Sequence, residues 1–198
     1  MTMARVVVVA GGIGSGKSVV CRILSAMGRE VYDCDTRAKA LMDSSEDIKS
    51  QISARISADA VDADGGIDRK RLASVVFSDP SKLAILNGIV HGAVRDDVSR
   101  RVSEMPEEGY LFVETAIPHA SGLDVMADAI ICVEAPLSVR VERVMRRSGL
   151  TEAQVISRID AQQGEAAAID SNPDTIRILN DGKTPILPQL LGILDKLP

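Results

Sequence analysis

Aromatic residues are almost absent from this chain: they make up 2% of its 198 residues, and there is no tryptophan. A protein this poor in aromatic rings does not hold single-stranded nucleic acid by stacking bases on side chains. The net charge of −5 also argues against DNA, RNA or an anionic membrane, because such partners select a clustered positive field. We therefore expect neither a nucleic-acid partner nor a membrane partner, and any anionic ligand must be held by local cations.

Cysteine is scarce as well. The three cysteines, Cys21, Cys34 and Cys132, are odd in number and include no C-x-x-C pair, so neither a disulfide framework nor a zinc site is indicated. The N-terminal apolar run from Val6 to Ala10 is too short for a membrane span or a signal-peptide core. We expect a cytoplasmic protein, and the sequence does not indicate its oligomeric state.

The residues that are present predict an α/β fold. The chain is 45% hydrophobic and 26% charged, as is typical of folded proteins, and it is long enough for one well-buried core. Short β-branched runs alternate with longer helical patterns, which predicts a parallel sheet covered by helices. The five expected strands are Val6–Ala10, Glu30–Asp33, Tyr110–Glu114, Ala129–Glu134 and Thr175–Asn180.

Glycine and proline mark the ends of two expected helices. The first helix should run from Lys17 to about Met27, because Gly28 is a natural C-terminal stop. Pro185 and Pro188 are expected to bracket a turn before a last short helix.

Between the second and third strands the pattern predicts a helical insertion. From Thr36 to Glu108 there is no convincing strand, and polar helical stretches surround a glycine-containing turn at 62–66. Further along, Leu137–Gly149 is helical and rich in arginine, and Thr151 is placed to open another helix. We expect a single domain, 1–198, with its core at 1–35 and 110–198, the insertion at 36–109 and a lid at about 138–165.

The clearest motif is Gly-Gly-Ile-Gly-Ser-Gly-Lys-Ser at residues 11–18, which satisfies G-x-x-x-x-G-K-[ST] between an apolar strand and an amphipathic helix. In such a loop, successive backbone N–H groups point into one concavity, and the N-terminus of the following helix adds partial positive charge there. We therefore expect the loop to bind the phosphates of ATP. Lys17 should reach the β- and γ-phosphates, and Ser18 should ligate Mg²⁺. The predicted nucleotide-binding residues of this loop are Gly12, Ile13, Gly14, Ser15, Gly16, Lys17 and Ser18.

A phosphate loop alone does not separate kinases from GTPases, motors or transporters. The chain has no N-K-x-D motif for guanine, and it is too short for most motor architectures. A small sheet with a helical insertion and an arginine-rich segment is the plan of a small-molecule kinase, in which insertion and lid close over two substrates.

Two aspartates are candidates for the acceptor side of such a kinase. Asp33 and Asp35 stand at the carboxyl end of the second strand, where α/β sheets bind ligands, and in extended chain both would point to one face. A hydroxyl acceptor must lose its proton as it attacks phosphorus, and Asp35 is the predicted base. The alternative is that one of the two aspartates only caps the helix that follows.

Glu114 ends the third strand and is expected to point toward the Mg²⁺ of the loop as an indirect or water-mediated partner; the alternative is a charge that only marks the strand end. In the lid, Arg143 and Arg147 are four residues apart and share a helix face that could neutralise charge in the transition state. The alternative for that face is ordinary solvation and pairing with glutamates. Two further arginines, Arg140 and Arg146, lie on the same segment.

Histidine is limited to His91 and His119, and from pattern alone each is more typical of packing or of the surface than of catalysis. The insertion is locally cationic, which suits either an acceptor with a pyrophosphate or plain surface charge. Its basic residues include Arg69, Lys70, Arg71, Arg95, Arg100 and Arg101.

Beyond the phosphate loop, the order and spacing of several stretches resemble the dephospho-coenzyme A kinase family over nearly the whole chain. The resemblance implies a five-stranded parallel sheet with a helical coenzyme-binding insertion and a lid, and transfer of a phosphoryl group from Mg-ATP to the ribose 3′-hydroxyl of dephospho-coenzyme A. The stretches that carry it are Ala10–Ser18, Val31–Asp35, Asp64–Arg69, Ile89–His91, Ser121–Asp124, Arg143–Gly149 with Gln162, and Asn180–Gly182.

The resemblance also implies site residues. The second aspartate of the family's D-x-D falls on Asp35, and the lid arginines fall on Arg143 and Arg147. Asn180 and Gly182 fall in the turn beside the adenine. The stretch that contains His91 resembles the family's substrate-binding helices, and we expect Asp33, His91 and Glu114 to bind the substrate.

The chain departs from the family's pattern at three places. Gly92 follows His91 where the family usually has proline, and His119 and Ala120 stand where it tends to have an aromatic residue and a glutamate. The segment 163–172 contains no arginine or lysine, although the family commonly has a basic residue there. Two alternatives therefore stay open: a nucleoside or nucleotide kinase, and a nucleotide-binding regulator of the same fold with weak catalysis.

Overall fold

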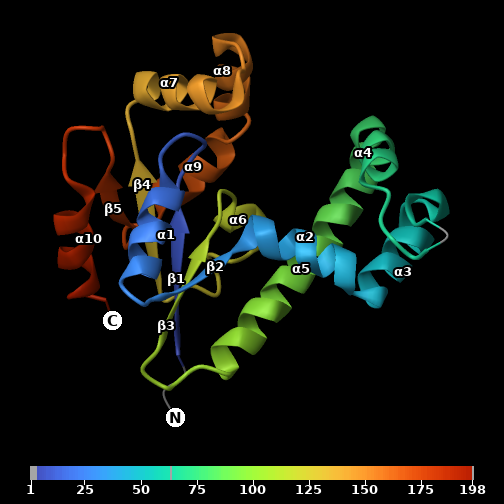
Figure 1. Ribbon diagram of the computed structural model, residues 1–198, viewed down its shortest axis with the longest axis horizontal. Helices are drawn as coiled ribbons and strands as arrows, with labels where there is room; N and C mark the ends of the chain where they lie inside the picture. Colours follow the sequence, from blue (N-terminus) through green and yellow to red (C-terminus); the bar gives the residue numbers. More distant parts are fainter. Residues whose placement is uncertain (1–3, 63, 198) are drawn as a thin grey trace. The chain divides into compact units, whose positions relative to one another are not determined.

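A computed structural model of the chain describes residues 4–62 and 64–197 (Figure 1). All strand pairs of its sheet are parallel, the strand order is β2-β3-β1-β4-β5, and the sheet confirms the expected fold class. The strands are β1 (Arg5–Ala10), β2 (Glu30–Asp33), β3 (Tyr110–Glu114), β4 (Ala129–Glu134) and β5 (Ile176–Leu179).

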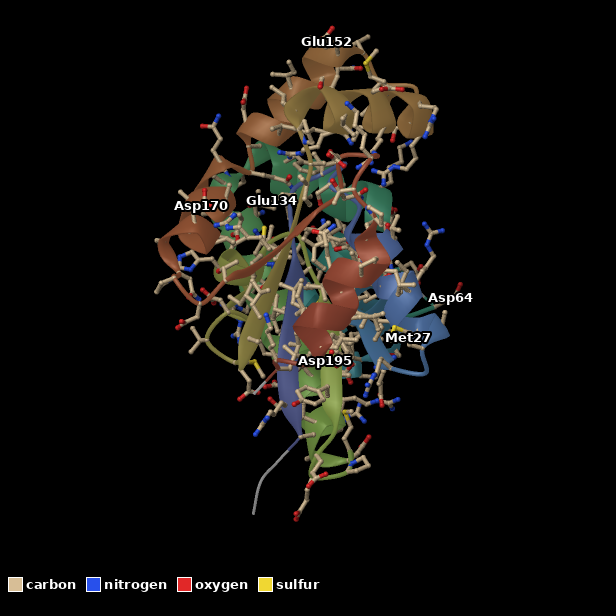
Figure 2. The ribbon with its side chains drawn as sticks, turned by 90° about the vertical axis from the view of Figure 1, so that its left-hand side faces the viewer. Met27, Asp64, Glu134, Glu152, Asp170 and Asp195 are labelled. Carbon is tan, nitrogen blue, oxygen red and sulfur yellow. The ribbon has the colours of Figure 1, made fainter. Side chains whose placement is uncertain are left out.

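The sequence of the central strand β1 is a nearly continuous apolar run because helices cover both faces of the sheet. Val7, Val8 and Val9 are fully buried, as expected for a parallel strand with no solvent side. Helices α1 (Lys17–Ala26) and α10 (Ile186–Leu194) lie on one face, and α6 (Pro118–Ser121) and α9 (Gln163–Ser171) lie on the other (Figures 1 and 2).

Helix ends follow the sequence signals closely, with one exception. Gly28 has φ of 77° directly after α1, as a C-terminal stop requires, and Thr151 begins α8 (Glu152–Asp160) with a capping box. The expected turn between Pro185 and Pro188 is wrong, because α10 already begins at Ile186. A proline in the first turn of a helix is tolerated, since its missing N–H would have no partner inside the helix.

The chain divides into two compact units, one formed by the chain up to Asp33 and from Val102 onward, the other by Cys34–Arg101. The second unit is built from helices, and an isolated bridge joins Val61 to Ile67. Its apolar core includes Ile52, Leu72 and Val76. Its elements are α2 (Cys34–Ser44), α3 (Glu46–Arg55), η1 (Ala58–Ala60), α4 (Arg69–Ser78) and most of α5 (Pro80–Ser103).

Among the described residues, no helix has both the length and the apolar character needed to cross a membrane.

Candidate active site

The phosphate loop connects β1 to α1 at the carboxyl edge of the sheet. Gly16 has φ of 98°, and a side chain there would collide with Asn180, whose Nδ2 lies 2.1 Å from an ideal Cβ position. A Cβ on Gly12 would lie 2.3 Å from a guanidinium nitrogen of Arg140. The loop therefore needs glycine at both ends, for close approach as well as for conformation.

Two groups of the loop are placed for phosphate oxygens. Lys17 opens α1, and its Nζ lies 2.6 Å from the carbonyl oxygen of Gly11. Ser15 is buried, and its Oγ has no hydrogen-bond partner among the described residues. Since buried hydroxyls are nearly always hydrogen-bonded, an unpartnered one in a phosphate loop fits a ligand oxygen. The loop thus fits the phosphates of ATP.

The ends of β2 and β3 bring acidic side chains close to this lysine. Asp33 and Glu114 are register partners on neighbouring strands. Burial raises the pKa of the Cys21 thiol on α1, and the charge and hydrogen bond of Glu114 raise it further. Lys17 lowers that pKa, and Asp33 adds to the increase, so all three charges lie close enough to act on one thiol. Lys17, Asp33 and Glu114 therefore all lie near the Cys21 thiol at this edge of the sheet.

Helix α7 (Leu137–Ser148) binds the loop on its Gly16 side through Arg143. One terminal nitrogen of the Arg143 guanidinium donates to the Asn180 carbonyl oxygen at 3.0 Å, and the other donates to the Asn180 Oδ1 at 3.1 Å. Asn180 is buried, and its Nδ2 donates to the Ser15 carbonyl oxygen at 2.8 Å. The Asn180 side chain is therefore engaged on both its oxygen and its nitrogen within the protein.

The same helix contacts the loop on its Gly12 side through Arg140. Arg140 Nε donates to the Ile13 carbonyl oxygen at 2.9 Å, and Gln162 Oε1 accepts from the Ile13 N–H at 2.8 Å. The Ile13 side chain packs against an apolar cluster of α7 and α8 that includes Val144 and Val155. The tip of the loop is thus joined to the lid segment by its backbone and by its side chain.

A pocket of about 300 Å³ opens next to Gly12 within the first unit. Its walls are the loop, the end of β4, Arg140 of α7, and the segment from the end of α8 through α9. The lining residues are Gly11, Gly12, Ser15, Ala116, Cys132, Val133, Glu134, Ala135, Arg140, Ile159, Gln162, Gln163, Glu165, Ala166, Ile169 and Asp170.

The remaining predicted residues belong to other elements of the chain. Asp35 and His91 belong to the second unit. The idea that Asp33 and Asp35 share a face of extended chain is wrong, because α2 begins at Cys34 and Asp35 lies in its first turn. A carboxylate there interacts favourably with the helix N-terminus. Arg147 and Gly182 are exposed.

Magnesium also fits the donors at this edge. The Ser18 hydroxyl is exposed in the first turn of α1, and the carboxylates of Asp33 and Glu114 end neighbouring strands. These are hard oxygen donors, which Mg²⁺ prefers, and Mg²⁺ is usually bound by few protein groups together with substrate phosphates. Among residues 4–62 and 64–197, no cluster of three or more acidic, histidine or cysteine side chains could hold a metal by itself.

Sequence reasoning missed Arg140 and Gln162 as site residues. Arg140 stands three positions before Arg143, so helical spacing alone could have placed both on one face. For Gln162 the only signal was its place in the family resemblance, because it acts through a backbone contact with residue 13, which is 149 positions away.

The fold and this loop define a P-loop kinase of small size. A shikimate kinase from Acinetobacter baumannii has the same fold, with a TM-score of 0.53 at 14% identity over 100% of this chain and 97% of that one. The sequence pattern of dephospho-CoA kinase matches residues 5–185, and the chain belongs to the dephospho-CoA kinase family.

Individual relatives agree with this assignment. A dephospho-CoA kinase of Porphyromonas gingivalis is 36% identical over 187 residues, which are 94% of this chain and 91% of the relative. One from Bacteroides fragilis is 31% identical over 192 residues, 97% of this chain and 92% of the relative. The crystal structure of the Thermus thermophilus protein TT1252 covers 99% of both chains with a TM-score of 0.76 at 32% identity.

Proposed function

We propose that the protein is a dephospho-CoA kinase, which transfers the γ-phosphoryl group of Mg-ATP to the ribose 3′-hydroxyl of dephospho-coenzyme A, the last step of coenzyme A synthesis. The observation that carries the proposal is the family match over residues 5–185 in a chain that keeps a complete phosphate loop. The family supplies the acceptor, and the loop supplies the donor site.

The donor half of the reaction rests on the loop. The backbone N–H groups of residues 12–18 and the N-terminus of α1 hold the phosphates, and Lys17 stabilises the charge of the β- and γ-phosphates. Ser15, with its unpartnered buried hydroxyl, donates to a phosphate oxygen. Mg²⁺, held by the Ser18 hydroxyl and the phosphates with Glu114 acting through water, would supply electrostatic neutralisation of those phosphates.

The acceptor half rests on the helical unit and on Asp35. Asp35 takes the proton of the 3′-hydroxyl as its oxygen attacks phosphorus, and Asp33 and His91 bind the acceptor. Asn180 and Gly182 form the turn beside the adenine. Arg143 and Arg147 are the proposed lid arginines, and Arg143 also donates to Asn180. The expected cytoplasmic location stays a prediction from the sequence.

An acceptor assay tests the proposal. The purified protein is incubated with Mg-ATP and, in separate reactions, with dephospho-coenzyme A or with a panel of nucleosides and nucleoside monophosphates, and ADP release is coupled to product detection by mass. Fast turnover of dephospho-coenzyme A alone supports the proposal. Preferred turnover of a nucleoside or nucleotide supports the second candidate, and ATP binding without transfer to any acceptor supports a regulator.

A further inference from the structure

The Gly12 side of the phosphate loop contains an arginine without a counter-charge. Arg140 is half-buried, and its one hydrogen bond to the described residues runs from Nε to the Ile13 carbonyl oxygen. No carboxylate pairs with it in the part of the chain that the structure describes. Burial lowers the pKa of its guanidinium below the usual value, and the nearby Cys132 thiol opposes part of that change. Since arginine stays charged in proteins, this cation is only partly compensated.

The acidic residues of the adjoining pocket are all engaged elsewhere. Glu134 and Asp170, labelled in Figure 2, both pair with Arg177, the latter at 2.8 Å. Glu165 accepts from the backbone N–H groups of His119 and Ala120 at 3.0 and 2.8 Å. Arg140 is the one lysine or arginine among the residues that line the pocket. No carboxylate among the lining residues is therefore ion-paired with the Arg140 guanidinium.

A second, independent observation points to the same kind of ligand. Ser15 Oγ is a buried donor with no partner among the described residues, and Ser15 lines the same pocket. A guanidinium without an anion and a hydroxyl without an acceptor at one pocket are complementary to a group that is rich in anionic oxygens, such as a phosphoryl group.

The position along the loop indicates which phosphoryl group this is. Lys17 Nζ lies at the carbonyl oxygen of Gly11, and the Arg140 guanidinium lies over Gly12, so two cations bracket adjacent residues at the end of the loop. The lysine of a phosphate loop meets the β- and γ-phosphates. The phosphoryl group between Lys17 and Arg140 is therefore the terminal one, beside the pocket.

We propose that Arg140 is a catalytic residue that contacts the γ-phosphoryl group as it is transferred. During transfer the bond from phosphorus to the ADP oxygen breaks, a bond to the acceptor oxygen forms, and the acceptor proton goes to the base. Arg140 stabilises the charge on the equatorial oxygens. Arg143, three residues further along α7, bonds to the backbone and side-chain oxygens of Asn180. This assignment rests on the proposed function.

The test compares Arg140→Gln, Arg140→Lys and the control Arg158→Gln, which removes an exposed arginine of α8 that lies outside the pocket by the loop. Each full-length variant is assayed for kcat with dephospho-coenzyme A, and its affinities for ATP and ADP are measured by calorimetry without acceptor. We expect Arg140→Gln to lower kcat by about 10²–10³-fold, as removal of a donor to a developing oxyanion does. We also expect it to remove most of the preference for ATP over ADP, while ADP affinity stays within about twofold of the unchanged protein.

Arg140→Lys keeps the charge but loses the fork geometry, so it should recover part of kcat and of the ATP preference. Arg158→Gln should behave as the unchanged protein. Two results would overturn the proposal: a kcat and an ATP-to-ADP affinity ratio that match those of Arg158→Gln, or equal losses of ATP and ADP affinity, which would mean that Arg140 only holds Ile13. If the unchanged protein transfers phosphate to no acceptor, the proposed function fails, and the affinity ratio still decides the role of Arg140 as a γ-phosphate ligand.

Discussion

The two sides of the phosphate loop differ in how far the protein satisfies its own polar groups. On the Gly16 side, Asn180 and Arg143 bond to each other and to the loop. On the Gly12 side, Ser15 Oγ has no partner among the described residues and Arg140 has no carboxylate. A satisfied side holds its shape before any ligand arrives, whereas an unsatisfied side is stabilised by the ligand itself.

One helix supplies an arginine to each side. Arg140 and Arg143 are three residues apart on α7 and therefore share a face, yet the first points to a pocket and the second to a buried asparagine. The two arginines therefore have different roles although they are identical side chains on one helix. The role of each depends on the residues that it contacts. The comparison predicts that mutations on the Gly12 side alter catalysis, and that mutations on the Gly16 side alter stability and nucleotide binding together.

The largest effect is expected at Lys17, which serves both sides. Lys17→Ala removes a charge-assisted contact to the β- and γ-phosphates, so kcat should fall and ATP binding should weaken. Combining a loss of 10²–10³-fold in kcat with a lost charge contact gives a decrease in kcat/KM for ATP of roughly 10⁴-fold. Steady-state kinetics with varied ATP measure it, and a change in KM alone would contradict a role in transfer.

Asp35→Asn should separate transfer from nucleotide binding. The amide cannot accept the proton of the hydroxyl, so kcat should fall by about 10²–10⁴-fold. ATP affinity should stay nearly unchanged, because the donor site keeps all of its groups. Single-turnover rates and calorimetry measure the two quantities. An unchanged rate would remove Asp35 from its role as base.

Asn180→Ala should break the satisfied side of the loop. It removes the side-chain donor to the Ser15 carbonyl and one of the two Asn180 acceptors of Arg143, so we expect a loss of about 1–3 kcal/mol in the free energy of unfolding. ATP and ADP should lose affinity by the same factor, since the defect lies in the loop and not at the terminal phosphate. Urea unfolding and calorimetry measure these effects, with the exposed Asn87→Ala as control. A selective loss of ATP affinity would contradict the division between the two sides.

The smallest expected effect is a change in the pKa of His119, whose backbone N–H donates to Glu165 in the wall of the pocket. The hydrogen bond and charge of Asp124 raise the pKa of exposed His119, whose Nδ1 lies 2.9 Å from an Asp124 oxygen. A raised folded-state pKa means that the stabilisation is complete below the ordinary value near 6.5 and is lost as pH rises through the higher value. NMR titration should find a His119 pKa above 6.5, and Asp124→Asn should bring it down; equal values in both proteins would contradict the contact.

The sequence was sufficient for the sheet because its strands are local signals. Four of the five expected strands agree with the structure to within one residue, and the fifth, expected at Thr175–Asn180, is shorter by one residue at each end. Buried parallel strands are short β-branched runs followed by glycine or by charged residues, and a phosphate loop is a contiguous motif.

Contacts between residues far apart in the sequence could not be predicted from local sequence patterns. Arg140 contacts the carbonyl oxygen of Ile13, which is 127 positions away, and no local pattern indicates that contact. The prediction that Asp33 and Asp35 share one face of an extended chain was wrong. The helix α2 begins at Cys34, earlier than the sequence pattern indicated. The place of Asn180 in the turn beside the adenine stays a prediction, and the folded loop adds that both ends of its side-chain amide bind the protein.

Product analysis tests the central claim most directly. The protein is incubated with Mg-ATP and dephospho-coenzyme A, and the product is characterised by mass and by ³¹P NMR. A single new phosphomonoester on the ribose 3′-oxygen, formed in step with ADP, is the predicted result. A phosphate at another position, or ADP formed with no change in dephospho-coenzyme A, would contradict the account.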